Sequence, residues 1–429
     1  MALLIKNVRA IDPQQQLDEV CDILVRDGKI VEVGKDLSIE KGETRDLSGK
    51  IAVPGLVDMH VHLREPGYEW KEDIASGTKA AVCGGFTAVC CMPNTNPVID
   101  NAEVVEFVNK RAHDTGRCRV HVAGSCSQGL KGETLSEMGD MVAHGAVAFT
   151  DDGRGVQGAG MMRRVLDYAH QFNKTVMSHC QDEDLVGEGQ VNEGIISTRL
   201  GMLGWPAEGE ELQIARDIAL CRLTGTPLHI QHISTSRGLD MVRAAKEEGL
   251  PVSCEVTPHH LFLNEDVIGP DYNSFFKVNP PLRTQEDNDA LIAGVVDGTI
   301  DCIVTDHAPH AAWEKDCEFE LAPFGMVGLE TSLGLINTQL VKTGLIDYAR
   351  LVEMMAINPR RILHVEEVSF APESTADITI FDPDVAWSVD PSEFASKARN
   401  SGFAGADLLG RATDVYIDGY AALQDGKLV

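Results

Sequence analysis

Short apolar runs alternate with longer segments of helical periodicity through the middle of the chain. Eight runs read as buried strands: Leu56–Leu63, Thr87–Met92, Arg119–Ala123, Ala146–Thr150, Thr175–His179, Leu228–Ile233, Pro251–Val256 and Ile300–Thr305. Helices are expected between them, among others over Asp73–Cys83, Ala102–His113, Met161–Phe172, Glu210–Thr224 and Leu239–Glu248. This pattern predicts an α/β fold, a parallel (β/α)8 TIM-like barrel over residues 54–364. A doubly wound open sheet is the alternative, but no G-x-G-x-x-G turn follows the first run to support a dinucleotide site.

The two ends of the chain share a different pattern, in which apolar and polar residues alternate over short stretches. The stretches are Leu3–Val8, Asp22–Arg26 and Lys29–Val33 at one end, and Ala376–Phe381 and Asp414–Ile417 at the other. Asp27-Gly28 is a hairpin signal between two of them. Neither end could bury a core alone, which disfavours two independent β-tails. We therefore expect one small β-domain made from residues 1–53 and 365–429, with the barrel inserted between its halves.

Composition narrows the class of protein. The chain has 429 residues, 43% of them hydrophobic, and a formal net charge of −29. Such acidity argues against nucleic acid and anionic membranes as partners. The eleven cysteines are scattered without a C-x-x-C pair, which favours reduced thiols over a disulfide framework. No apolar run reaches the roughly 18–20 residues of a membrane span, and no signal peptide is visible, so we expect a cytoplasmic protein.

The first predicted barrel strand contains the pair His60-Val61-His62. Residues two apart in a strand point to the same face, so both imidazoles can bind one metal ion. Taken alone, an H-x-H pair is more often two ordinary core or surface histidines. The barrel interpretation adds a condition, because active sites in this fold lie at the carboxyl ends of the strands.

Other predicted strands also end in potential ligands. His179, His232 and Asp306 each close a strand, and Asp151-Asp152 follows the fourth. Four histidines with two carboxylates can hold two divalent ions, with one carboxylate shared between them. Nitrogen and oxygen ligation without thiolate suits zinc, with manganese, cobalt or iron as alternatives. The residues alone do not separate Asp151 from Asp152.

Several motifs together resemble the cyclic amidohydrolase superfamily and, within it, the dihydroorotases of the long bacterial type. The motifs are Pro54-Gly55-Leu56-Val57-Asp58-Met59-His60-Val61-His62-Leu63-Arg64, Met92-Pro93-Asn94-Thr95, Phe149-Thr150-Asp151-Asp152-Gly153, Gly204-Trp205-Pro206-Ala207-Glu208, Val256-Thr257-Pro258-His259-His260 and Thr305-Asp306-His307-Ala308-Pro309-His310. The resemblance covers nearly the whole chain and implies a metal-bearing barrel with a small β-domain formed by both termini.

The resemblance also implies roles for individual residues. It assigns His60, His62 and Asp306 to one zinc ion, His179 and His232 to a second, and Asp152 to both. It assigns the substrate to His62, Arg64, Asn94, Asn279, His310, Phe324 and Gly325. The implied reaction is the reversible closure of N-carbamoyl-L-aspartate to L-dihydroorotate in pyrimidine biosynthesis, with Asp306 as proton shuttle. We expect the loop from Ala311 to Pro323, with Trp313 and Phe319, to fold over the bound ring.

Two rival functions remain. Hydantoinases and allantoinases share the barrel, but many use a carboxylated lysine as the bridge, and here the fourth strand ends without a lysine. Some dihydroorotase-like chains lack metal ligands and serve as non-catalytic partners of aspartate transcarbamoylase, whereas this chain keeps every expected ligand. A homo-oligomer such as a dimer is expected, and association with aspartate transcarbamoylase is left open.

Overall fold

The computed structural model describes residues 2–429. Eight parallel strands form one sheet in the order β15-β14-β13-β10-β9-β8-β7-β6. Their bounds are β6 (Leu56–Val61), β7 (Phe86–Cys91), β8 (Arg119–Gly124), β9 (Ala146–Phe149), β10 (Thr175–Ser178), β13 (Leu228–Ile230), β14 (Val252–Val256) and β15 (Cys302–Ile303). A parallel bridge between Val61 and His307 joins the first strand to the segment after the last. The backbone N–H of His62 donates to His307 O at 2.9 Å and so completes the barrel.

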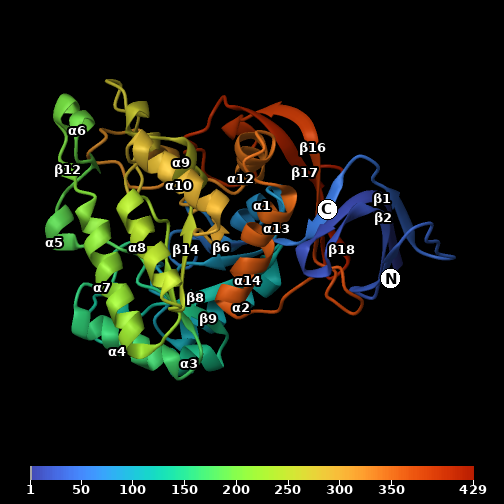
Figure 1. Ribbon diagram of the computed structural model, residues 1–429, viewed down its shortest axis with the longest axis horizontal. Coiled ribbons are helices and arrows are strands. Elements are labelled where there is room, and N and C mark those ends of the chain that lie inside the picture. Colours follow the sequence, from blue (N-terminus) through green and yellow to red (C-terminus); the bar gives the residue numbers. More distant parts are fainter. Residues whose placement is uncertain (1) are drawn as a thin grey trace.

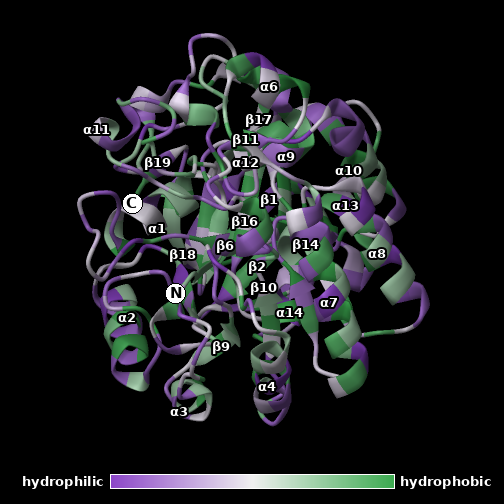
Figure 2. Cartoon of the chain, turned by 90° about the vertical axis from the view of Figure 1, so that its left-hand side faces the viewer, coloured by the Kyte–Doolittle hydropathy of each residue, from purple (hydrophilic) through white to green (hydrophobic). Residues whose placement is uncertain are grey.

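The predicted strands and helices are confirmed along the barrel. The covering helices are α1 (Ile74–Cys83), α2 (Ala102–Thr115), α3 (Met138–Ala143), α4 (Ala159–His170), α7 (Glu208–Thr224), α8 (Ser236–Glu247), α10 (Gln285–Asp297), α12 (Ser332–Ile336), α13 (Tyr348–Val352) and α14 (Asn358–Leu363). Several begin at a side-chain cap, such as Asp73 before α1 and Thr284 before α10. Figure 2 shows hydrophobic and hydrophilic residues side by side on these helices, as expected where one face packs on the barrel and the other meets solvent.

Strands from both ends of the chain form a second, nine-stranded sheet beside the barrel (Figure 1). Its strands are β1 (Ala2–Asp12), β2 (Leu17–Arg26), β3 (Lys29–Gly34), β4 (Glu43–Asp46), β5 (Ile51–Pro54), β16 (Ile378–Ser388), β17 (Asp407–Ile417), β18 (Tyr420–Gln424) and β19 (Lys427–Leu428). β5 pairs antiparallel with β16, where Ile378 lies opposite Pro54. This pairing joins the two ends directly, which confirms the predicted terminal β-sheet. The domain limits at residues 53/54 and 364/365 stay a prediction.

Three insertions at the carboxyl ends of the strands complete the molecule. Between β10 and α7 the chain forms α5 (Glu183–Val186), β11 (Val191–Asn192), α6 (Ile195–Leu200) and β12 (Gly204–Trp205). α9 (Pro258–Phe262) follows β14, and α11 (Ala312–Lys315) follows β15. These insertions surround the mouth of the barrel. Within residues 2–429, no helix is long and apolar enough to cross a membrane.

Candidate metal centre and substrate pocket

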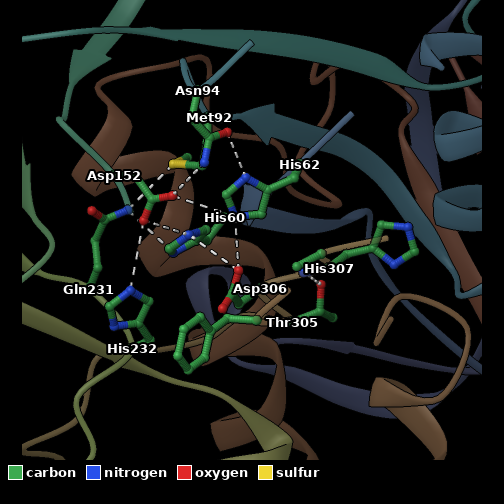
Figure 3. Close-up of polar contacts among 12 residues, drawn as sticks. His60, His62, Met92, Asn94, Asp152, Gln231, His232, Thr305, Asp306 and His307 are labelled. Atoms are coloured by element: carbon green, nitrogen blue, oxygen red, sulfur yellow. Dashed lines mark hydrogen bonds and ion pairs between the residues drawn. The ribbon is translucent and has the colours of Figure 1, made fainter. Parts of the chain in front are cut away.

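Polar side chains from five strand ends converge at the mouth of the barrel. Figure 3 labels those that come from β6, β9, β13 and β15. The six side chains are His60 in β6 and His62 just after it, Asp152 after β9, His179 after β10, His232 after β13 and Asp306 after β15. All six are buried. Parallel strands bring their carboxyl ends to one rim of the barrel, which explains how residues up to 246 positions apart meet here.

Asp306 faces the first pair of histidines. Its Oδ1 lies 3.0 Å from His62 Nε2 and 3.6 Å from His60 Nε2. These three residues offer ligand atoms that all lie within 4.8 Å of one another. One imidazole pair from a rigid strand and a carboxylate from the segment paired with it at the closure of the barrel form a usual set for a divalent cation.

Asp152 lies at the centre of the group. Its Oδ1 is 3.3 Å from His60 Nε2, 3.4 Å from His179 Nδ1 and 3.7 Å from His232 Nε2. Its Oδ2 is 3.5 Å from His62 Nε2. The adjacent Asp151 points away and accepts hydrogen bonds from the backbone N–H groups of Cys126 and Ser127. The geometry therefore puts Asp152, not Asp151, among the histidines.

Hydrogen bonds on the outer side of the rings fix which nitrogen faces inward. His60 Nδ1 lies 2.6 Å from Glu255 Oε1, and His62 Nδ1 lies 2.9 Å from Asn94 Oδ1. His179 Nε2 lies 2.9 Å from Gln181 Oε1. These oxygens only accept hydrogen bonds, so each outer nitrogen carries a hydrogen and the inner one faces the cluster, where a proton or a metal ion can take its lone pair. Metal-binding histidines are commonly held in this way.

The donor set fits divalent metal ions. His60 Nε2 is buried and makes no hydrogen bond within residues 2–429, which is costly for a polar atom unless a cation takes its lone pair. A second group, His60, Asp152 and His232, also brings its ligand atoms within 4.8 Å of one another. The two groups share His60, and its inward nitrogen can bind only one ion. A second ion would therefore need a ligand besides His60, and His179 Nδ1 lies 3.4 Å from Asp152 Oδ1 on that side of the cluster.

Electrostatics favour a cation here. Burial lowers the pKa of His60, but the carboxylates of Glu255 and Asp152 outweigh burial and raise it well above the usual value. Burial raises the pKa of Asp306, yet the positive charge of His60 and a hydrogen bond from His62 bring it below the ordinary range. The pKa of Asp152 is lowered in the same way by the surrounding histidines. The carboxylates thus stay ionised and attract positive charge.

Two buried carboxylates behind the cluster were missed by the sequence analysis. Glu255 in β14 contacts His60 and, through Oε2, His229 Nε2 at 3.1 Å. Asp58 in β6 accepts from the backbone N–H groups of His60 and Thr305, at 3.1 Å each. Asp58 therefore couples the strand of the histidine pair to the residue before Asp306. A charged residue inside an otherwise apolar strand was the available signal for both.

The backbone is strained where the site residues leave their strands. Arg64, His232 and Asp306 have φ values of 62°, 31° and 45°, a region that side chains other than glycine seldom adopt. Such strain is typical of functional sites, where the fold holds a side chain in one direction.

All the predicted substrate residues line a cavity of about 200 Å³ next to the cluster. They are His62, Arg64, Asn94, Asn279, His310, Phe324 and Gly325. Arg64 donates from Nε to Pro309 O at 3.2 Å, and no carboxylate within residues 2–429 lies within 4.0 Å of its guanidinium. Asn279 Oδ1 is buried without a hydrogen-bond partner in the same part of the chain. The cavity thus offers an uncompensated cation and a free amide oxygen beside the metal ligands.

The far wall of the cavity is backbone. His310 Nε2 donates to Phe324 O at 2.8 Å. Gly325 has φ of 130°, and a Cβ there would lie 2.6 Å from Ala308 Cβ. Only glycine fits this position, so the wall can approach a bound ring closely.

The loop from Ala311 to Pro323 differs from the expectation for its aromatic residues. Phe319 is 3% exposed and packs with Val191, Met202 and Ile268, away from the cavity. Trp313 is 68% exposed, and neither ring lines the cavity. The apolar side chain of Phe319 gains more by joining this small cluster than by remaining free at the mouth.

Comparison with known proteins agrees with this geometry. Residues 49–238 match the family described as Dihydro-orotase-like. The chain is 48% identical over 426 residues to the dihydroorotase of Pelotomaculum thermopropionicum, covering 99% of both chains. It is 49% identical over 420 residues to that of Geobacter metallireducens, covering 98% of this chain and 99% of the relative.

Solved structures share the whole fold at lower identity. The L-hydantoinase (dihydropyrimidinase) of Arthrobacter aurescens superposes with a TM-score of 0.89 at 25% identity, covering all of this chain and 97% of that one. The dihydropyrimidinase of Brevibacillus agri gives a TM-score of 0.89 at 21% identity, covering 100% and 96%. The barrel with its terminal sheet is therefore common to these amidohydrolases.

Proposed function

The chain belongs to the dihydroorotase family of cyclic amidohydrolases, and we propose that its mouth cavity closes N-carbamoyl-L-aspartate to L-dihydroorotate, reversibly and with loss of water. The observation that carries this proposal is the presence of Arg64, a guanidinium without a carboxylate partner in residues 2–429, in one cavity with five of the six potential metal ligands. A ring that carries a carboxylate can place this group on Arg64 at one end of the cavity and its reacting amide beside the metal ligands at the other.

The metal ligands are proposed as follows. His60, His62 and Asp306 would hold one ion, and His179 and His232 a second, with Asp152 shared between them. The inward-facing nitrogens and the contacts of Asp152 with all four histidines support this division. Zinc suits a set of imidazoles and carboxylates. When bound, such ions polarise a carbonyl and bring the pKa of water from 15.7 to roughly 7.

The chain's own groups would bind and orient the substrate. Arg64 would bind the ring carboxylate with two parallel hydrogen bonds, helped by Asn94, and His310 would be a further substrate contact. Burial, with the positive charges of Arg64 and Lys71 nearby, lowers the pKa of His310. His310 is therefore neutral, and its one N–H donates from Nε2 to Phe324 O, which fixes this wall of the cavity. Asn279 and the backbone of Phe324 and Gly325 would contact the rest of the ring.

Asp306 is proposed to move the proton. In the hydrolytic direction it would accept a proton from the attacking water and deliver it to the leaving ring nitrogen. A carboxylate can accept a proton in one step and return it in the next. Its position at the eighth strand end faces the cavity, which it lines together with Arg64. Such transfer typically contributes about 10²–10⁴ in rate.

Substrate preference tests the proposal. We expect kcat/KM for dihydroorotate to exceed that for hydantoin or allantoin by at least about 100-fold, because only dihydroorotate carries the carboxylate that pairs with Arg64. The measurement is hydrolysis of each ring by one metal-loaded preparation at one pH. A higher value for hydantoin or allantoin would contradict the proposal and favour the rival amidohydrolase function.

A second prediction concerns Glu255, which holds His60 from behind. Glu255→Gln is expected to weaken metal binding by about 10- to 100-fold, the usual effect of losing the partner of a metal-binding histidine. A neutral amide cannot enforce hydrogen on Nδ1 as a carboxylate does. Metal affinity would be measured by competition with a chromophoric chelator. Glu247→Gln on the exposed face of α8 is the matched control, and equal affinity in both variants would refute the role of Glu255.

Cellular setting follows from the chemistry of the chain. We propose a cytoplasmic location, which all eleven unpaired cysteines support, because reduced thiols persist there.

We also propose a homo-oligomer, a dimer in the simplest case, and leave association with aspartate transcarbamoylase as the alternative assembly. Mass measurement of the purified chain, alone and mixed with aspartate transcarbamoylase, distinguishes these assemblies.

A further inference from the structure

Two buried lysines lie beside the substrate cavity without a negative partner. Lys277 is 2% exposed and Lys315 is 3% exposed. Within residues 2–429, neither ammonium has a carboxylate oxygen within 4.0 Å. Lysine is almost never fully buried unless its charge is compensated. The two ammonium groups therefore need another explanation.

Lys315, at the end of α11, donates hydrogen bonds from its ammonium group to three backbone oxygens. Its Nζ lies 2.7 Å from Pro323 O, 3.0 Å from Ser274 O and 3.4 Å from Lys277 O. Pro323 ends the 311–323 loop, whereas Ser274 and Lys277 belong to the segment between α9 and α10. The ammonium group of Lys315 thus connects the 311–323 loop with the segment between α9 and α10.

Lys277 makes the reciprocal connection. Its Nζ donates to Phe319 O at 2.8 Å and to Glu320 O at 2.9 Å, both in the 311–323 loop. The ammonium also lies 4.6 Å from the centre of the Phe324 ring, where the face of an aromatic ring attracts a cation. Its own carbonyl accepts from Gly325 N at 2.8 Å.

These contacts end at the cavity wall. Phe324 and Gly325 line the cavity, and Phe324 O accepts the hydrogen bond from His310. Trp205 supports the Phe324 ring edge-on, with ring centres 5.7 Å apart. Lys277 also lies two residues before Asn279, another cavity residue. A shift of the loop would therefore move several proposed substrate contacts together.

We propose that Lys277 and Lys315 are positioning residues that anchor the 311–323 loop and thereby set the Phe324–Gly325 wall against the substrate ring. The expected effect on dihydroorotate binding rests on the proposed function. The anchoring of the loop does not depend on that function. An apolar residue at either position would leave buried carbonyls without donors, so the loop would separate from the segment between α9 and α10, residues 263–284. The anchor works by loop position and takes no part in the chemistry.

The test compares Lys277→Met and Lys315→Met with Lys174→Met. Lys174 is a partly buried lysine just before β10, at the opposite end of the barrel from His179, and serves as the matched control. Loop exposure is measured by cleavage of the native protein with a glutamate-specific protease, because the loop contains Glu314, Glu318 and Glu320. Kinetics with dihydroorotate and the bound metal per chain are measured on the same preparations.

We expect both loop variants to be cleaved in the loop at least about tenfold faster than the control, through more frequent local opening. We expect KM for dihydroorotate to rise about tenfold while kcat falls less than about threefold, the pattern of lost binding that is equal in ground and transition states. Metal content should not change. Lys277→Gln keeps amide N–H donors and should lie between Lys277→Met and the unaltered protein, which covers the case in which a methionine variant does not fold.

Unchanged cleavage of the loop in the folded variants would overturn the anchoring. Faster cleavage with unchanged KM would overturn the link between the loop and the substrate wall. If the unaltered protein did not turn over dihydroorotate, the proposed function would fail, and the cleavage comparison alone would still decide the anchoring.

Discussion

Asp306→Asn is expected to reduce kcat by about 10²–10⁴ while most of the metal stays bound. Asparagine has nearly the same shape and keeps one carbonyl oxygen at the position that now lies 3.0 Å from His62 Nε2. It cannot accept and return a proton near neutral pH. The remaining ligands, with Asp152 at their centre, are unchanged. Turnover and metal content should therefore respond very differently.

The measurement is kcat in both reaction directions, together with metal per chain from elemental analysis. Both directions should lose about the same factor, because the same group moves the proton each way. Asp316→Asn, an exposed aspartate of the 311–323 loop, is the control and should keep kcat within about twofold. Near-normal kcat in Asp306→Asn would refute the proton role, and loss of metal in proportion to activity would make Asp306 a ligand only.

The fold was predictable because its signals are local. A strand buried on both faces requires a continuous apolar run, and a covering helix requires apolar residues at helical spacing. Both signals were clear from Leu56 to Thr305, and each predicted strand overlaps an observed one. The pairing of β5 with β16 was inferred only indirectly, since neither terminal segment could form a core alone.

The positions of most site residues could be predicted from the same pattern of strands. Once the strands were placed, His60, His62, His179, His232 and Asp306 fell at their carboxyl ends. The choice between Asp151 and Asp152 did not follow, because adjacent residues at a strand end differ only in which side of the turn they face. It took the hydrogen bonds of Asp151 to Cys126 and Ser127 to show which carboxylate faces the histidines.

Contacts between distant segments could not be read from the chain. Glu255 contacts His60 across 195 residues, and Lys277 reaches Glu320 across 43. Each depends on how neighbouring strands or insertions pack, for which a single sequence has no periodic signal. The burial of Phe319 has the same origin, since its partners Val191 and Met202 come from the unpredicted insertion after β10.

Arg64→Met is expected to raise KM for both dihydroorotate and N-carbamoyl-aspartate by about 10- to 100-fold, with a smaller effect on kcat. A hydrogen bond to a charged group is worth about 1.5–3 kcal/mol, and each 1.4 kcal/mol corresponds to tenfold in affinity. Methionine fills a similar volume, so the cavity wall should keep its shape. Burial already lowers the pKa of Arg64, and the paired substrate carboxylate would offset that cost in the complex.

The substrate preference of Arg64→Met shows whether Arg64 binds the substrate carboxylate directly or only adds to the positive potential around the cavity. Arg64→Met should lose most of its preference for dihydroorotate over hydantoin, because hydantoin has no carboxylate to lose. Arg154→Met changes an exposed arginine next to the cavity residue Gly153 and should alter KM less than about threefold, as expected for a solvent-screened charge. If both variants raised KM equally, the positive field around the cavity would bind the substrate, and Arg64 would have no special place in recognition. If hydantoin hydrolysis fell as steeply as dihydroorotate hydrolysis, Arg64 would support the shape of the site and would not bind the carboxylate.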